Sequence, residues 1–185
     1  SITCHGLAAH SANPARGCNA IALAADMVKT VEALQEELKN NAAKDEHFEV
    51  PYSTMQVGLI RGGVALNIVP DLCDVQFEMR LLPGADPQPW LERLRNEATR
   101  RCADTPHARI EIETLNAYPG LDTAEDAPFL RAIMRITGDN RPARLGFGTE
   151  GGLFNDYLNM PVVICGPGPI DRPPQADEFI LPEEL

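Results

Sequence analysis

The first two thirds of the chain alternate between strand-like and helix-like patterns of apolar residues. Residues 2–9 form a short apolar run that ends in small residues, which predicts a short strand. Residues 19–39 predict a long amphipathic helix, because apolar residues recur there at helical spacing, namely Ile21, Ala24, Met27, Val28, Val31, Leu34 and Leu38. A second helix is expected at about 87–102, with Asp86 as its cap.

Three further segments alternate apolar and polar residues, as strands with one buried face do. They are residues 52–63, which end at a pair of glycines, residues 72–81, and residues 107–115. Pro70 has no N–H to donate, so the short segment before it should lie at a sheet edge or separate from the main strand. The order β-α-β-β-α-β predicts an α+β fold of the ferredoxin-like kind, with two helices on one face of an antiparallel sheet.

A connection containing proline and glycine, residues 116–128, marks an expected domain boundary near residue 118. Residues 1–117 would then be one domain and residues 118–185 a second. Continuous apolar strands between helices are typical of a buried, mostly parallel sheet, but two strands cannot close such a layer. We therefore expect an incomplete α/β segment there. Its elements would be a helix at about 127–137, a short strand at about 143–147, a second helix around Leu153 and an apolar strand at 161–166.

Both ends of the chain suggest a piece of a longer protein. The chain starts without methionine, and the pattern predicts a strand from its second residue onward. At the other end, Pro182 followed by Glu183 and Glu184 resembles the first turn of a helix, where proline and acidic residues are favoured.

Composition narrows the class of protein and its partners. The chain has 185 residues, of which 44% are hydrophobic and 23% charged, as is ordinary for a globular protein. A net charge of −11 argues against nucleic acid or an anionic membrane as partner. The five cysteines are scattered without a CxxC pair, and the sequence shows neither a long apolar span nor a leader, so we expect free thiols and a cytoplasmic protein.

Metal and nucleophile motifs are weak in this sequence. The four histidines show no HxH, HExxH or HxD spacing, so a complete metal site within this chain is not expected. Ser11 follows His10 directly, but neighbouring residues do not form a triad, and GxSxG is absent.

Several single residues have two interpretations. His10, at the hinge before the long helix, is either a structural hydrogen-bonding group or a catalytic one. Taken alone, Asn67 is expected to satisfy local backbone at the strand break, and Arg80 to pair with Glu78 on the open sheet face. The stretch "GFGTEGG", residues 146–152, is a tight turn or a site for a carboxylate at a helix start.

Three motifs together carry a resemblance to a known family. "GLAAHSANPARGCNAI", "ALNIVPDLCDVQFEMRLLPG" and "GFGTEGGLF" followed by "MPVVICGPGPID" and "ADEFILPEEL" occur in the order of a family of zinc-dependent amidohydrolases. This is the acetylornithine deacetylase and succinyl-diaminopimelate desuccinylase family. The sequence is most similar to the acetylornithine deacetylases.

The resemblance implies an architecture and a reaction. Residues 1–117 would be a ferredoxin-like dimerisation or lid domain that forms a homodimer, and residues 118–185 part of the α/β catalytic domain. The parent enzyme would hydrolyse small N-acyl amino acids with zinc or cobalt, held mainly by an upstream half that this chain lacks. This chain alone would bind no metal and be inactive. The alternative is a non-catalytic dimerisation or effector-binding module derived from the same family.

The resemblance also implies roles for particular residues. His10 would stabilise the oxyanion in the partner subunit's active site. The substrate would be bound by five residues, Asn67, Arg80, Thr149, Glu150 and Gly151. Pro174 stands where the family has a metal-ligating histidine, so a two-zinc site of the usual kind is not expected.

Overall fold

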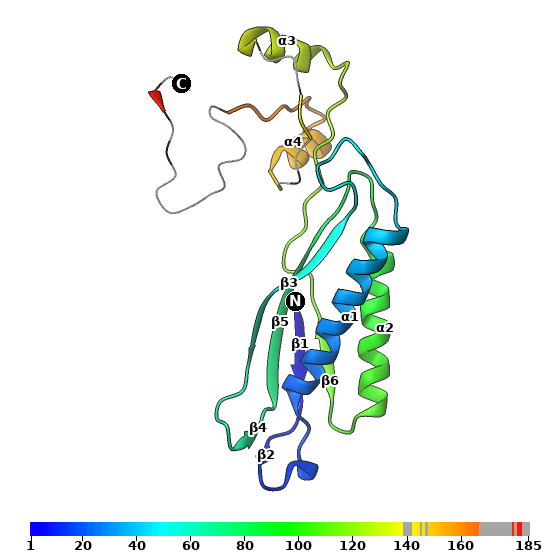
Figure 1. The fold of residues 1–185 in the computed structure, drawn as a ribbon, viewed down its shortest axis with the longest axis vertical. Coiled ribbons are helices and arrows are strands. Elements are labelled where there is room, and N and C mark those ends of the chain that lie inside the picture. Colours follow the sequence, from blue (N-terminus) through cyan, green and yellow to red (C-terminus); the bar gives the residue numbers. More distant parts are fainter. Residues whose placement is uncertain (139–141, 145, 147, 167–178, 180, 183–185) are drawn as a thin grey trace. The chain divides into compact units, whose positions relative to one another are not determined.

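The computed structural model describes residues 1–138, 142–144, 146, 148–166, 179 and 181–182 (Figure 1). The chain divides into two compact units. The first contains Ser1–Asp122 and Ala143–Thr149, and the second contains Thr123–Pro142 and Glu150–Leu185. The chain therefore passes into the second unit and returns briefly to the first before the glycine-rich stretch ends.

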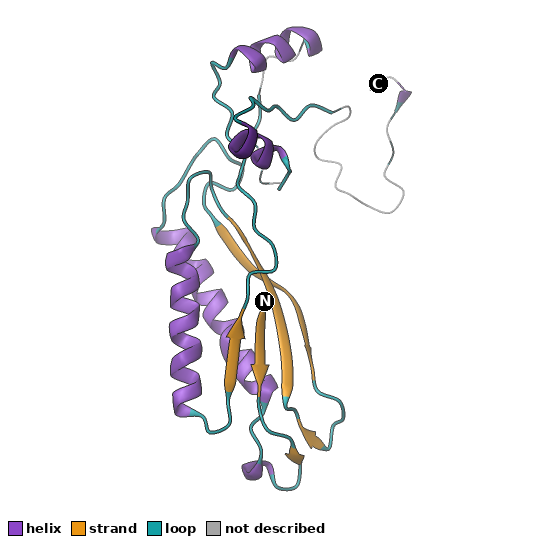
Figure 2. Ribbon diagram, turned by 180° about the vertical axis from the view of Figure 1, so that it is seen from behind, coloured by secondary structure: helices purple, strands orange, loops and turns teal. Residues whose placement is uncertain are grey.

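The first unit is a four-stranded antiparallel sheet covered on one face by two helices (Figures 1 and 2). Its strand order, β3-β5-β1-β6, with helices between β1 and β3 and between β5 and β6, confirms the α+β, ferredoxin-like prediction. The strands are β1 (Ile2–His5), β3 (Thr54–Gly62), β5 (Leu72–Arg80) and β6 (Arg109–Ile112), and the helices are α1 (Ala20–Asn41) and α2 (Gln88–Asp104).

Helix α1 forms largely as its apolar spacing predicts. Asn19 caps it, because its side-chain oxygen accepts hydrogen bonds from the backbone N–H of Ile21 at 2.9 Å and of Ala22 at 3.1 Å. Ile21, which the spacing places on the apolar face, is exposed and lies in the first turn of the helix. The buried residues of α1 are Ala20, Leu23, Ala24, Met27, Val31, Leu34 and Leu38.

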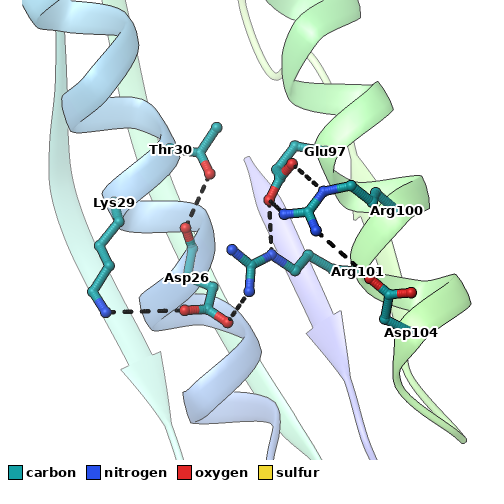
Figure 3. A network of polar contacts seen from close by, with 7 residues as sticks. All are labelled: Asp26, Lys29, Thr30, Glu97, Arg100, Arg101 and Asp104. Carbon is teal, nitrogen blue, oxygen red and sulfur yellow. Dashed lines mark hydrogen bonds and ion pairs between the residues drawn. The ribbon is translucent and has the colours of Figure 1, made fainter.

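Helix α2 packs beside α1 through Leu94 and Ala98, which are both buried. It begins at Gln88 after Pro87, and Asp86 accepts a hydrogen bond from the Gln88 N–H at 2.9 Å, close to the cap position predicted. An ion-pair network joins the two helices (Figure 3). Arg101 of α2 bonds to Asp26 of α1 and to Glu97 of its own helix, each at 2.7 Å.

The strand predicted over residues 2–9 is divided in two. Gly6 packs against the Cys18 backbone, where a Cβ would lie 2.9 Å from the carbonyl carbon, so the chain leaves the sheet after β1. The continuation, β2 (Ala9–His10), pairs with β4 (Ile68–Val69) in a separate two-stranded sheet. Pro70 lies between β4 and β5, which confirms that the segment before the proline separates from the main strand.

The second unit contains helices α3 (Pro128–Thr137) and α4 (Gly151–Leu158), near the positions predicted. The apolar strand predicted at 161–166 is wrong: these residues, all of them described, form no strand. A strand needs a hydrogen-bonding neighbour, and the described residues of this unit supply none. Of the short strand predicted at 143–147, the described residues show an isolated bridge between Arg144 and Phe48, and residues 145 and 147 lie outside the described residues. Glu183 and Glu184, predicted in the first turn of a helix, also lie outside them.

None of the helices among the described residues is long and apolar enough to cross a membrane.

Candidate functional site

His10 lies on a small projection at one end of the first unit, which we call the flap. The flap consists of β2, β4 and the turn of residues 11–17, which contains the short helix η1 (Pro14–Arg16) (Figure 1). His10 faces Ile68 in the ladder, and the Ser11 N–H donates to the Asn67 carbonyl at 3.0 Å. The fold thus brings His10 and Asn67 together, although they are 57 positions apart in the sequence.

The surrounding backbone fixes the orientation of the His10 ring. The Ala12 N–H donates to Nδ1 of His10 at 3.1 Å, and the Asn13 N–H donates to the His10 carbonyl at 2.9 Å. An Nδ1 that accepts a hydrogen bond carries no proton, so in this arrangement the ring proton is on Nε2. The exposed imidazole therefore presents an N–H donor away from its own loop.

Arg80 lies at the last position of β5 and makes two kinds of contact. Its Nε donates to Oε1 of Glu78 at 3.2 Å, and its Nη1 donates to the Gly146 carbonyl at 2.9 Å. Gln56 of β3 also donates to Glu78, at 3.0 Å. The Arg80 guanidinium, followed by the Gln56 amide, lowers the pKa of Glu78. The ion pair expected on the open sheet face is present, and Arg80 is in addition bonded to the glycine-rich stretch.

The other candidate substrate residues lie at the end of that stretch. Thr149 is half-buried in the first unit. Glu150 and Gly151 belong to the second unit, where Glu150 precedes α4 and its carbonyl accepts the N–H of Leu153 at 3.0 Å. Backbone N–H groups at a helix start suit a carboxylate. Pro174 lies outside the described residues.

The flap and Arg80 occupy opposite ends of the same sheet. The flap precedes Leu72 at the start of β5, and Arg80 ends that strand. Eight residue steps at about 3.3 Å each separate the two ends by about 26 Å. An amino-acid-sized ligand cannot touch both within one chain.

Two further kinds of site are relevant among the described residues, a metal site and a nucleophilic cysteine. No group of three His, Cys, Asp or Glu side chains in the described part of the chain could hold a metal ion. All five cysteines lie in that part and are free thiols, and burial raises the pKa of Cys4 to about 12, which makes it a poor nucleophile. His5 and His47 pair with Glu111 and Asp45 on the surface.

One residue at this site was not expected from the sequence. Tyr118, which the sequence places in the connection between domains, packs against Gly148 of the glycine-rich stretch. The only signal available was the neighbouring Pro119-Gly120 turn, which indicates a loop and no contact partner.

Comparison with known proteins places these features in a family. Residues 1–106 match the family model of the peptidase dimerisation domain. The acetylornithine deacetylase of Myxococcus xanthus is 32% identical over 192 residues, which cover all of this chain and 48% of the relative. The acetylornithine deacetylase of Edwardsiella ictaluri is 32% identical over 181 residues, covering 97% of this chain and 46% of the relative. The chain thus spans about half the length of the curated relatives it matches.

Solved structures support the same fold. A tripeptidase from Staphylococcus aureus aligns with a TM-score of 0.63 and 21% identity, over 86% of this chain and 40% of that one. An amidase of the hydantoinase/carbamoylase family from Burkholderia vietnamiensis aligns with a TM-score of 0.61 and 19% identity, over 80% of this chain and 34% of that one.

Proposed function

Because the chain belongs to the peptidase dimerisation domain family, we propose that it is part of a metal-dependent amidohydrolase of the acetylornithine deacetylase type. The parent enzyme would remove the acyl group from small N-acyl amino acids. Residues 1–117 would form the homodimer, and residues 118–185 would belong to the catalytic domain. The observation that carries the proposal is that acetylornithine deacetylases match 97–100% of this chain at 32% identity.

His10 has the geometry that the proposed reaction needs. Attack of water on an acyl carbonyl produces an oxyanion, which a fixed N–H donor stabilises more than it stabilises the starting carbonyl. The bond from the Ala12 N–H to Nδ1 leaves the proton on Nε2, so the ring can donate without first being protonated. Asn67, which directly precedes β4 and whose carbonyl accepts the Ser11 N–H, would contact the same substrate.

The flap would act on the partner subunit's substrate. Within one chain, about 26 Å of strand β5 separates the flap from Arg80, which we propose binds a substrate carboxylate through its guanidinium group. If both contact one substrate, the two must come from different subunits. Thr149 is proposed as a further substrate-binding residue. Glu150 and Gly151 are also proposed to bind substrate, because the backbone N–H groups at the start of α4 suit a carboxylate.

The exposed edge of the sheet supports the homodimer. Strand β3 lies at the end of the strand order, so its outer edge has no strand neighbour among the described residues. Leu59 and Ile60 of β3 and the adjoining Val64 and Leu66 leave large apolar surfaces exposed. We propose that β3 of two subunits meet at this edge.

The metal of the proposed reaction would be zinc or cobalt, which supplies an activated water at neutral pH. The described residues do not fit such a group, since they contain no cluster able to hold it. Its ligands would lie elsewhere in the parent protein. The substitution of Pro174 for a ligating histidine stays a prediction. Free thiols at all five cysteines suit a reducing compartment, and we propose the cytoplasm.

The test uses the full-length protein with zinc and a panel of N-acetyl amino acids. His10→Ala should lower kcat by on the order of 10²-fold, as loss of an oxyanion donor does, and leave the dimer intact. His47→Ala, which changes another exposed histidine, is the matched control and should leave kcat unchanged. No hydrolysis by the unmodified protein would favour a non-catalytic module, and an unchanged kcat for His10→Ala would overturn its assigned role.

A further inference from the structure

Gly148 leaves a space that the ring of Tyr118 fills. A Cβ built on Gly148 would overlap the Tyr118 hydroxyl oxygen and lie 2.8 Å from both Cε2 and Cζ of the ring. The backbone of Gly148 does not adopt the left-handed conformation that favours glycine, in contrast to Gly138 at the end of α3. Gly148 thus leaves room for the ring, and a side chain at this position would have to displace Tyr118 whatever the backbone angles allow.

Neighbouring glycines show that this contact is local. A Cβ on Gly146, two positions earlier, or on Gly120, two positions after Tyr118, would meet no described atom within 4 Å. Among the described glycines, a methyl group would thus overlap the tyrosine at Gly148 and would meet no described atom at Gly146 and Gly120.

Two side-chain groups of the first unit hold the same segment, residues 143–149. Arg80 donates to the Gly146 carbonyl at 2.9 Å. Arg144 pairs with Asp122 at 3.0 Å and lies 3.7 Å from Asp45. With the Tyr118 ring on Gly148, three described residues of the segment, Arg144, Gly146 and Gly148, contact other parts of the first unit.

We propose that Tyr118 is a positioning residue that holds Gly148 in place and so keeps Gly146 and Thr149 positioned relative to Arg80. This inference rests on the proposed function, in which Arg80 and Thr149 bind the substrate carboxylate together. An aromatic ring has few rotatable bonds, so it can hold a backbone segment at a small cost in conformational entropy. Without the ring the segment would shift relative to the guanidinium, and a displacement of about 1 Å is enough to weaken a bidentate carboxylate contact.

The kinetic test is a double-mutant cycle in the full-length enzyme. Gly148→Ala and Tyr118→Ala should each raise KM for an N-acetyl amino acid by on the order of tenfold, with a smaller change in kcat. Tyr118→Phe keeps the ring and should restore the KM, and Gly120→Ala should leave it unchanged. Because the collision needs both partners, adding Gly148→Ala to Tyr118→Ala should raise KM no further. Additive effects, or a Gly148→Ala variant that behaves like Gly120→Ala, would overturn the inference.

Hydrogen exchange tests the inference without any activity. In the folded full-length protein, Gly148→Ala and Tyr118→Ala should speed exchange of the amides of residues 143–149 by at least about tenfold, and Gly120→Ala should not. Failure of the proposed function would leave this result intact, whereas unchanged exchange in both variants would overturn the positioning role even in an active enzyme.

Discussion

Replacing Ile60 by aspartate should separate the two subunits of the proposed dimer without unfolding either. Ile60 lies on the edge strand β3, and 52% of its surface is exposed in the single chain. A residue this exposed contributes little to the stability of its own subunit, so a change there should alter the free energy of unfolding by about 0.5 kcal/mol or less.

The expected effect on the dimer follows from the exposed fraction. Burying a whole isoleucine side chain is worth about 1.5–3 kcal/mol, so burying the remaining half contributes about 1 kcal/mol. A two-fold axis places the substitution in the interface twice, which doubles the loss to about 2 kcal/mol. Each new carboxylate must also lose its water, at a cost of about 1 kcal/mol or more. The total exceeds about 3 kcal/mol, which raises the dimer Kd by more than about 10²-fold.

Sedimentation velocity over a dilution series measures this Kd directly. Leu115→Asp is the matched control. Leu115, like Ile60, is a well-exposed large aliphatic residue, but it follows β6 at the opposite edge of the sheet. Ile60→Asp should sediment as a monomer at concentrations where the unmodified protein and the control are dimers. A dimer of unchanged Kd, or an equal loss in the control, would refute the pairing of β3 edges.

Two further predictions concern the stability of the first unit. Leu94 is fully buried between α2 and the rest of the core, so Leu94→Ala should lower the free energy of unfolding by about 2–5 kcal/mol in urea titrations, and a loss below about 1 kcal/mol would contradict the packing described. Arg100 and then Arg101 lower the pKa of Glu97 to about 2 from its ordinary value of 4.5. The contribution of ionised Glu97 to the free energy of unfolding is therefore fully present above pH 4.5 and is lost as the pH falls toward 2. After allowance for solvent screening, this contribution is about 1 kcal/mol. Glu97→Gln should remove this part of the pH dependence of stability. An acid-unfolding profile identical in the two proteins would contradict the ion-pair network of Figure 3.

Local patterns predicted much of the first unit because its elements are amphipathic. Helix α1 buries seven residues at helical spacing, and β5 alternates buried Cys73 and Val75 with polar neighbours, so both elements could be predicted from their patterns. Local patterns did not predict the break at Gly6, because it results from packing against Cys18, twelve positions away. The apolar run 161–166 shows the opposite error, since apolar character alone does not form a strand without a partner strand.

The candidate site depended more on the fold than on local sequence. The sequence alone left both interpretations of His10 open, and the resemblance supplied the role in the partner's site. The nearness of Asn67 depends on the pairing of β2 with β4, whereas the tautomer follows from a local hydrogen bond, donated by the Ala12 N–H within the same turn. Tyr118 could not be found at all from the sequence, since its contact with Gly148 joins two loops that have no regular pattern.

The central claim, that the flap of one subunit serves the substrate bound by Arg80 of the other, is tested most directly by mixing two inactive variants. Full-length His10→Ala and Arg80→Ala proteins are dissociated, mixed in equal amounts and allowed to form dimers again, and hydrolysis of an N-acetyl amino acid is measured. Random pairing makes half of the dimers mixed, and each mixed dimer then has one site with both His10 and Arg80, so about a quarter of the unmodified activity should return. If the mixture stays as inactive as the separate variants, although mixed dimers have formed, the account is contradicted.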